Sequence, residues 1–410
     1  MPVPNFTSRS TAFVVGLVAL CATLVPSSAL AATTTSLNSA VAVGANGQSG
    51  VRALCTREAK RKLRRLSSRA STSTAATRKV RRTKAALQRR CVERRAKQLK
   101  SNATTPSASL AIGIDGGYSG WWDEEIQFRT ALGAPVTRHE WDPNQPVNDQ
   151  DDLVLAATTE VHTRIHALLG GNELGDANHY RDWVIDFIRR YGVGGSFWSE
   201  HPSLDASRYA ITTFELGNEP YFGGMSPSEY ADTVRPTLEA VQQLGLPAKL
   251  ILPSYIYDRE TQWIDTLYQR IPDLNSLFYA FADHPYWYGH APSDTSGGGS
   301  PFGRIETLRA KMTEHGAASK PVFFTEYGES TANCGSECVS ESVQADHIQE
   351  MIEASINRTA WKVEALFLYQ LHDWATNSTS REQQFGLLRQ DGSAKPAYAI
   401  ARAAMQRYGG

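Results

Sequence analysis

The fold is decided by residues 211–220, ITTFELGNEP, an apolar run that leads into a glutamate, Glu219. A second run of the same kind, residues 321–328 (PVFFTEYG), leads into Glu326, 107 positions later. Short apolar runs bounded by turn residues are typical of strands buried in a parallel sheet. If both strands belong to one α/β barrel, both carboxylates lie at the same rim, because the carboxyl ends of all the parallel strands meet there.

The remainder of residues 110–410 alternates between strand-like and helix-like segments. Strands are expected at residues 110–115, 135–140, 164–169, 211–218, 249–254, 278–283, 321–325 and 363–371. Helices are expected at residues 122–132, 151–160, 179–191, 228–244, 259–270, 302–315, 341–360 and 394–408. Eight strand–helix pairs in about 300 residues predict an α/β fold of the (β/α)8 TIM-barrel class.

The chain in front of the barrel divides into short regions. Residues 1–31 carry Arg9, an apolar run at 12–25 and an Ala-Leu-Ala ending, a pattern that predicts a secretory signal peptide and therefore an extracellular protein. Residues 32–50 and 101–109 have the composition of linkers, the first of them flexible. Residues 51–100 place leucines and Val80 at helical spacing on both sides of a Ser/Thr-rich break, which predicts a helical hairpin.

Charge separates the hairpin from the barrel, although the formal net charge of the whole chain is zero. Residues 51–100 hold 19 Lys/Arg and 2 Asp/Glu, whereas residues 101–410 hold 22 and 40. Such a basic hairpin can be a solvated helix pair, can dock onto the acidic barrel, or can bind an anionic cell-wall polymer or a membrane surface. Nucleic acid is not expected as a partner, because the hairpin has no aromatic side chain to stack on bases.

Four cysteines follow the signal peptide: Cys55, Cys91, Cys334 and Cys338. An even number of cysteines in a secreted chain favours disulfides, and sequence order suggests the pairs 55–91 and 334–338. A zinc site is disfavoured because no histidine stands at ligand spacing beside either pair. The second disulfide either pins the loop that follows Glu326 or stabilises a surface loop without consequence for the site.

Four motifs at successive strand ends carry a family resemblance. They are Gly-Asn-Glu-Pro at 217–220, Asp-His-Pro-Tyr at 283–286, Thr-Glu-Tyr-Gly at 325–328 and His-Asp-Trp at 372–374. Together they resemble the ends of strands 4, 6, 7 and 8 of the large clan of retaining (β/α)8 glycoside hydrolases, clan GH-A, which includes cellulases, mannanases and β-xylosidases. The resemblance covers residues 108–410.

The resemblance implies roles for individual residues. Glu219 would be the general acid/base, with a raised pKa, and Glu326 the nucleophile, with the two carboxyl groups about 5–5.5 Å apart. Asn218 would bind the sugar 2-hydroxyl, Tyr286 would orient the nucleophile, and Trp374 would form a stacking floor for the sugar. No metal or organic cofactor is implied, and the substrate is a carbohydrate.

Other residues are open to two interpretations. Glu215 shares the side-chain parity of Glu219 and is a rival acid, unless it lies deeper in the barrel beside a cation. Arg138 lies either near the nucleophile or in a surface ion pair. His284 either orients a carboxylate or fills space, and Trp374 is either platform or core. His139 and His372 have no assigned role.

The sequence therefore predicts a secreted, monomeric retaining β-glycosidase acting on a polysaccharide or an oligosaccharide. Two alternatives remain: a carbohydrate-binding protein that has lost catalysis on the same scaffold, and an envelope-adhesion protein in which the basic hairpin matters most.

Overall fold

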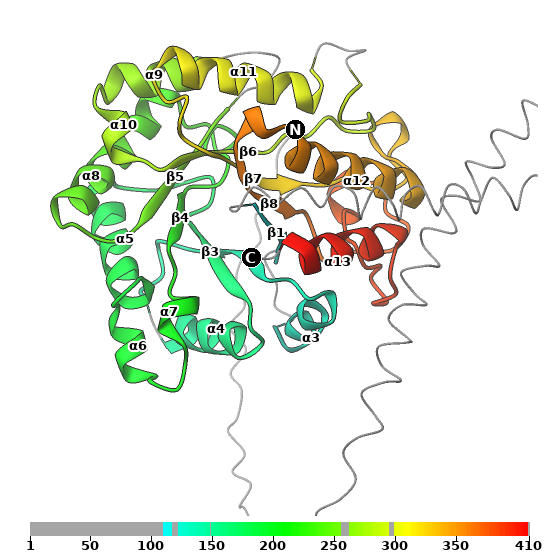
Figure 1. Ribbon diagram of the computed structural model, residues 1–410, viewed down its shortest axis with the longest axis horizontal. Helices are drawn as coiled ribbons and strands as arrows, with labels where there is room; N and C mark the ends of the chain where they lie inside the picture. Colours follow the sequence, from blue (N-terminus) through cyan, green and yellow to red (C-terminus); the bar gives the residue numbers. More distant parts are fainter. Residues whose placement is uncertain (1–109, 117–121, 148, 256–261, 295–298, 409–410) are drawn as a thin grey trace, which may run out of the picture. The chain divides into compact units, whose positions relative to one another are not determined.

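The computed structural model describes residues 110–116, 122–147, 149–255, 262–294 and 299–408 (Figure 1). The expected signal peptide, both linkers, the basic hairpin and the cysteines at 55 and 91 lie outside these residues. No helix in the described part of the chain is both long and apolar enough to cross a membrane.

The described residues form a closed barrel in which each of eight parallel strands pairs with the next and β8 pairs with β1. Figure 1 shows the ring of strands inside a ring of helices. The prediction of a (β/α)8 barrel is confirmed. The strands are β1 (Ala111–Asp115), β2 (Val136–Trp141), β3 (Arg164–Leu169), β4 (Thr213–Leu216), β5 (Lys249–Pro253), β6 (Ala280–Asp283), β7 (Val322–Tyr327) and β8 (Val363–Leu368).

Helices follow the strands as expected, with ends displaced by a few residues. The long helices are α3 (Trp122–Leu132), α4 (Asp149–Glu160), α5 (Ala177–Tyr191), α8 (Pro227–Gln243), α9 (Gln262–Arg270), α11 (Pro301–Glu314), α12 (Glu341–Asn357) and α13 (Pro396–Tyr408). The sequence did not predict the short α6 (Ser196–Glu200), α7 (Ala206–Tyr209) and α10 (Leu274–Leu277). Segments of four or five residues are too short to display a helical period.

Local sequence explains where the helices begin. The Ser226 hydroxyl accepts from the backbone N–H of Glu229, and the Glu229 carboxylate accepts from the backbone N–H of Ser226, a complete capping box ahead of α8. Asp176 caps α5 through the N–H groups of Asn178 and His179. These caps satisfy donors that would otherwise lack partners at the helix ends.

Two apolar layers stabilise the barrel. Inside it, aliphatic and aromatic side chains form a separate cluster: Val136, Ile251, Ala280, Ala282, Phe323, Ala365 and Phe367. Outside it, alternate strand residues pack against the helices in one continuous core. Two tyrosines of that core reach the strand ends: Tyr180 of α5 donates to the carbonyl of Leu169 at 2.7 Å, and Tyr230 of α8 donates to that of Leu216 at 2.8 Å. The ends of β3 and β4 are therefore tied to the helices behind them.

Candidate active site

The turn after β4 carries the first predicted carboxylate. Gly217 (φ +88°) and Glu219 (φ +44°) both have left-handed backbone, which is uncommon for a residue with a side chain. The N–H of Gly217 donates to the carbonyl of Leu169 at 3.0 Å, and that of Asn218 donates to the carbonyl of Gly171 at 3.0 Å. Bonds to the end of β3 thus hold a strained turn that projects Glu219 from the barrel rim.

An irregularity in β7 places the second carboxylate. Phe324 pairs with Leu366 of β8 and Tyr327 with Leu368, so β7 has one residue more than its partner over this interval. Such a bulge changes the side-chain alternation of the strand. As a result Thr325 and Glu326 both face the barrel interior, where each contacts a polar group of the site.

The buried side chain of Arg138, on β2, forms hydrogen bonds with residues of several of these strand ends. Its guanidinium donates to Asp115 at 2.7 Å, to Glu215 at 2.8 Å and to Glu326 at 2.8 Å, and also to the Asn218 side-chain oxygen at 2.8 Å. Burial by itself lowers the pKa of Arg138, but the three carboxylates raise it above its ordinary value. The alternative of a surface ion pair is wrong, because only 4% of this side chain is exposed.

Glu215 is held deep in the barrel and does not reach the cleft. Its carboxylate accepts hydrogen bonds from Arg138 and from the hydroxyl of Thr325, the latter at 2.9 Å. It also lies 3.1 Å from Nε2 of His166. Burial tends to raise the pKa of Glu215, yet Arg138 and His166 hold it well below its usual range. A carboxylate so deep and so firmly ionised cannot deliver a proton to a substrate. The rival assignment of Glu215 as the acid is therefore disfavoured.

Glu219, His284 and Glu326 form a close trio at the rim. Nδ1 of His284 lies 2.7 Å from Glu219 and 3.6 Å from Glu326, and its Nε2 lies 3.0 Å from the hydroxyl of Thr325. One oxygen of each glutamate and one nitrogen of His284 all lie within 4.8 Å of one another. Tyr286 donates to the second oxygen of Glu326 at 3.0 Å. His284 therefore orients both carboxylates and does not merely fill space.

The protonation of the trio differs from the sequence-based expectation. Burial raises the pKa of Glu326 to about 7. Burial also opposes ionisation of Glu219, but His284 lowers the pKa of that carboxyl. Burial lowers the pKa of His284, whereas Glu326 and Glu219 raise it to about 9. The expected raised pKa of Glu219 is thus wrong for the site without substrate, where the nearby proton lies on His284.

A cavity of about 860 Å³ opens over these groups. It is lined by both glutamates, Asn218, Tyr286, Arg138 and Trp374. Trp374 is 45% exposed, so it is not a core residue. A second cavity of about 240 Å³ shares Glu219, Tyr286 and several aromatic residues with the first and extends past His284 to Trp287. Because they share these lining residues, the two cavities adjoin and form one cleft.

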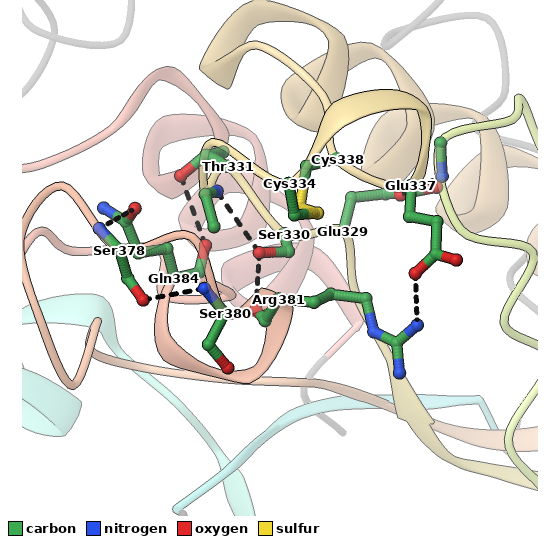
Figure 2. Close-up of a disulfide and its surroundings, with 12 residues drawn as sticks. Glu329, Ser330, Thr331, Cys334, Glu337, Cys338, Ser378, Ser380, Arg381 and Gln384 are labelled. Carbon is green, nitrogen blue, oxygen red and sulfur yellow. Dashed lines mark hydrogen bonds and ion pairs between the residues drawn. A yellow bond between two sulfur atoms is a disulfide. The ribbon is translucent and has the colours of Figure 1, made fainter.

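The loop after β7 builds one wall of this cleft. Cys334 and Cys338 are disulfide-bonded, as expected from their order, and Glu337 belongs to the short loop that this disulfide closes (Figure 2). Glu337 accepts from Arg381 at 2.9 Å, and both residues line the larger cavity. The Arg381 guanidinium lies 3.7 Å from the ring centre of Tyr288. The disulfide therefore braces a loop that borders the cleft.

Several lining residues were not singled out from the sequence. Asp115, Glu140, Tyr288, Tyr369, Arg381 and Phe385 all line the larger cavity. Asp115 and Glu140 could have been found, because each closes a predicted strand whose carboxyl end faces the rim. Arg381 carried no such signal, since it lies far along the sequence from the end of the preceding strand, β8. His139 and His372 do not line the cavity; they pack edge-to-face on Trp141 and Phe128.

The same trio offers the atom types that bind transition metals. However, Glu219 and His284 already share a hydrogen bond of 2.7 Å, and both oxygens of Glu326 accept hydrogen bonds. These contacts match proton transfer and nucleophile orientation better than metal coordination.

Comparisons with known proteins agree on the fold. No protein-family model matches the sequence, and no curated protein is significantly similar to it. Among solved structures, a family 39 glycoside hydrolase from Bacteroides cellulosilyticus WH2 has a TM-score of 0.57 at 14% identity; the match covers 74% of this chain and 64% of that one. A GH10 xylanase from Bispora sp. MEY-1 has a TM-score of 0.52 at 12% identity, covering 75% and 98%. At such identities the likeness concerns the barrel fold.

We predict that Arg138→Met strongly destabilises the protein. It would leave the buried carboxylates of Asp115, Glu215 and Glu326 without their common cation, at a cost of about 3–5 kcal/mol at pH 7. Because Arg138 depresses the pKa of Glu215, the stability that it contributes is present above the ordinary carboxyl pKa of about 4.5 and is lost at lower pH. Urea unfolding at pH 7 and pH 4 should therefore give a smaller difference between the variant and the wild type at pH 4.

The matched control is Arg181→Met, because Arg181 lies on the surface of α5 beside Asp182 and Asn178. Its unfolding free energy should stay within about 0.5 kcal/mol of wild type. Equal effects of the two substitutions would contradict the central role given to Arg138.

Proposed function

We propose that this chain is a secreted retaining β-glycosidase that hydrolyses O-glycosidic bonds of a polysaccharide or an oligosaccharide by double displacement. The observation that carries the proposal is the pair Glu219 and Glu326, whose nearest oxygens lie within 4.8 Å at the rim of the cleft. Retaining enzymes hold their two carboxyl groups about 5–5.5 Å apart, whereas inverting enzymes need roughly 6.5–9.5 Å to admit a water molecule. The short separation favours retention.

Glu326 is the nucleophile. Arg138 and Tyr286 each donate to a different oxygen of this carboxylate, so its orientation is fixed from two sides. Its carboxylate oxygen attacks the anomeric carbon and forms a covalent glycosyl ester, while the bond from that carbon to the leaving oxygen breaks.

Glu219 is the general acid/base. Its side chain is 21% exposed, compared with 10% for Glu326, and His284 contacts only one of its oxygens. Substrate excludes water from the Glu219–His284 hydrogen bond and thereby favours its neutral form, in which the proton has moved from Nδ1 to the carboxyl. Glu219 then gives that proton to the leaving oxygen. In the second step it takes a proton from the water that attacks the anomeric carbon and releases the sugar.

Three further residues bind the substrate. Arg138 engages the Asn218 side-chain oxygen, which leaves the amide NH₂ group free to donate to a hydroxyl of the sugar. Trp374 and Phe222, 45% and 65% exposed, present apolar faces on the cleft wall. Sugar rings pack their C–H faces on such side chains.

Removing either carboxylate tests the mechanism. With 4-nitrophenyl β-glycosides, Glu326→Ala should lower kcat by at least about 10³-fold, because no covalent intermediate can form. Glu219→Ala should slow release of the sugar from the ester, and added azide should restore turnover and yield the β-glycosyl azide, since a small anion needs no general base. Product configuration is read by NMR.

The control is Glu160→Gln, which changes an exposed glutamate and should retain wild-type turnover. Glu215→Gln is not a suitable control, because Glu215 accepts a hydrogen bond from Arg138. Undiminished hydrolysis by Glu326→Ala would refute the proposed nucleophile. Specific sugar binding by a wild type that hydrolyses no glycoside would instead favour the inactive carbohydrate-binding alternative.

The pH dependence of kcat/KM should be bell-shaped. Below about pH 7 Glu326 takes up a proton and cannot attack, and above about pH 9 the Glu219–His284 pair has lost the proton that the leaving group needs. In His284→Phe the lost cation no longer lowers the pKa of Glu326, so the acid limb should move up while the basic limb moves down. A profile of unchanged width in this variant would exclude His284 from the proton path.

The basic region at residues 51–100 belongs to the same proposal as an anchor to an anionic polymer of the cell envelope. Its 19 Lys/Arg against 2 Asp/Glu support electrostatic retention that weakens with salt. Deletion of residues 51–100 should abolish co-sedimentation with isolated cell walls at low salt while leaving aryl-glycoside hydrolysis intact. Equal sedimentation of both forms would argue against the anchor.

A further inference from the structure

Glu140 is a carboxylate in the cleft that the proposed mechanism does not use. It stands near the end of β2, two residues after Arg138, so that its side chain points to the same side of the strand. It lines the larger cavity together with both catalytic carboxylates. It therefore shares one cavity with the reacting groups.

A glycine makes room for this side chain. A Cβ atom on Gly171 would lie 2.9 Å from Oε1 of Glu140, so a side chain at position 171 would make this carboxylate shift from its place against the chain after β3. The carbonyl of Gly171 accepts from the N–H of Asn218. The backbone that seats Glu140 thus also positions the residue preceding the proposed acid.

Glu140 differs from the other carboxylates of the cavity in what it contacts. Glu219, Glu326, Glu337 and Glu382 each accept a hydrogen bond or face a cation within the described residues, and so does Asp115. Within the same part of the chain Glu140 accepts no hydrogen bond and forms no ion pair, although the charge of Arg138 acts on it from a distance. Burial raises the pKa of Glu140, and the charge of Arg138 offsets only part of this rise. An acceptor with no hydrogen-bond donor among the described residues is suited to a ligand that brings hydroxyl donors.

The charge around Glu140 narrows the class of ligand. Six carboxylates line the cavity, whereas its two arginines, Arg138 and Arg381, are already engaged with carboxylates. A sugar that carries a carboxylate would meet this excess of negative charge at short range, which disfavours it. A neutral sugar with two adjacent hydroxyls can instead donate to both oxygens of Glu140.

We propose that Glu140 is a substrate-binding residue that selects neutral sugars with adjacent free hydroxyls over sugars that carry a carboxylate. This inference rests on the proposed glycosidase function and names the substrate class of the same site.

The test uses the full chain and 4-nitrophenyl β-glycosides of glucose, xylose, mannose and galactose, with the glucuronide as the carboxylated counterpart of the glucoside. Oligosaccharides of β-1,4-linked glucose, xylose and mannose extend the panel. The variants are Glu140→Ala and Glu140→Gln. Asp142→Asn is the matched control, because it removes a negative charge near the same strand end from an exposed residue that does not line the cavity.

On the best neutral substrate, kcat/KM should fall by about 100-fold in Glu140→Ala and by about 10-fold in Glu140→Gln, which keeps one acceptor. The ratio of kcat/KM for that substrate to kcat/KM for the glucuronide should fall at least tenfold in Glu140→Gln, while Asp142→Asn stays within about twofold of wild type. Thermal unfolding followed by circular dichroism checks that the variants fold.

Two failures are distinguishable. If the wild type hydrolyses glycosides and both Glu140 variants match it within about twofold, the role of Glu140 is refuted while the glycosidase function stands. If the wild type hydrolyses no member of the panel, the proposed function fails and this inference fails with it.

Discussion

The site depends on a single buried cation. Arg138 is the common partner of Asp115 from β1, Glu215 from β4 and Glu326 from β7, and it also fixes the amide of Asn218. Without it, burial at the barrel mouth would force these carboxylates to take up protons. With it, the ends of four of the eight strands, β1, β2, β4 and β7, are held in one arrangement. The proposed nucleophile, Glu326, is thus oriented by the same cation that stabilises the buried carboxylates.

The polar residues inside the barrel mouth form two groups, one buried below the cleft and one at its floor. Below, Glu215 joins Arg138 to His166 and Thr325 and stays firmly ionised. Above, Glu219 and His284 share a proton where the cleft opens. In the proposed mechanism the lower group is structural and the upper one is reactive, because a general acid must reach both a proton source and the leaving oxygen.

The walls of the cleft come from loops and not from the strands. The disulfide loop after β7 and the loop after β8 meet through Glu337 and Arg381, and the Arg381 guanidinium covers Tyr288. In a barrel the strands hold the catalytic groups while the loops shape what can bind. In this protein the exposed aromatic side chains of Trp374 and Phe222 line the cleft, and so does the carboxylate of Glu140.

Much of the fold and part of the site could be predicted from local sequence. Most of the eight strands are predictable because they are short apolar runs that alternate with helical segments, and the two glutamates because each follows such a run. The 334–338 disulfide followed from the spacing of its cysteines, which lie on one short loop. The short helices α6, α7 and α10 were missed because four or five residues show no period.

By itself, then, the sequence determined the barrel and the rim at which the carboxylates lie. The barrel follows from the alternation of strand-like and helix-like segments, and the rim follows from the common direction of parallel strands. Only the tertiary structure decided which charges meet. The bulge in β7 turns Glu326 toward Arg138, and the closed ring brings His284 within 2.7 Å of Glu219, so that the proton lies on the histidine. Protonation depends on burial and on neighbours far apart in the chain, and no local pattern encodes either of them.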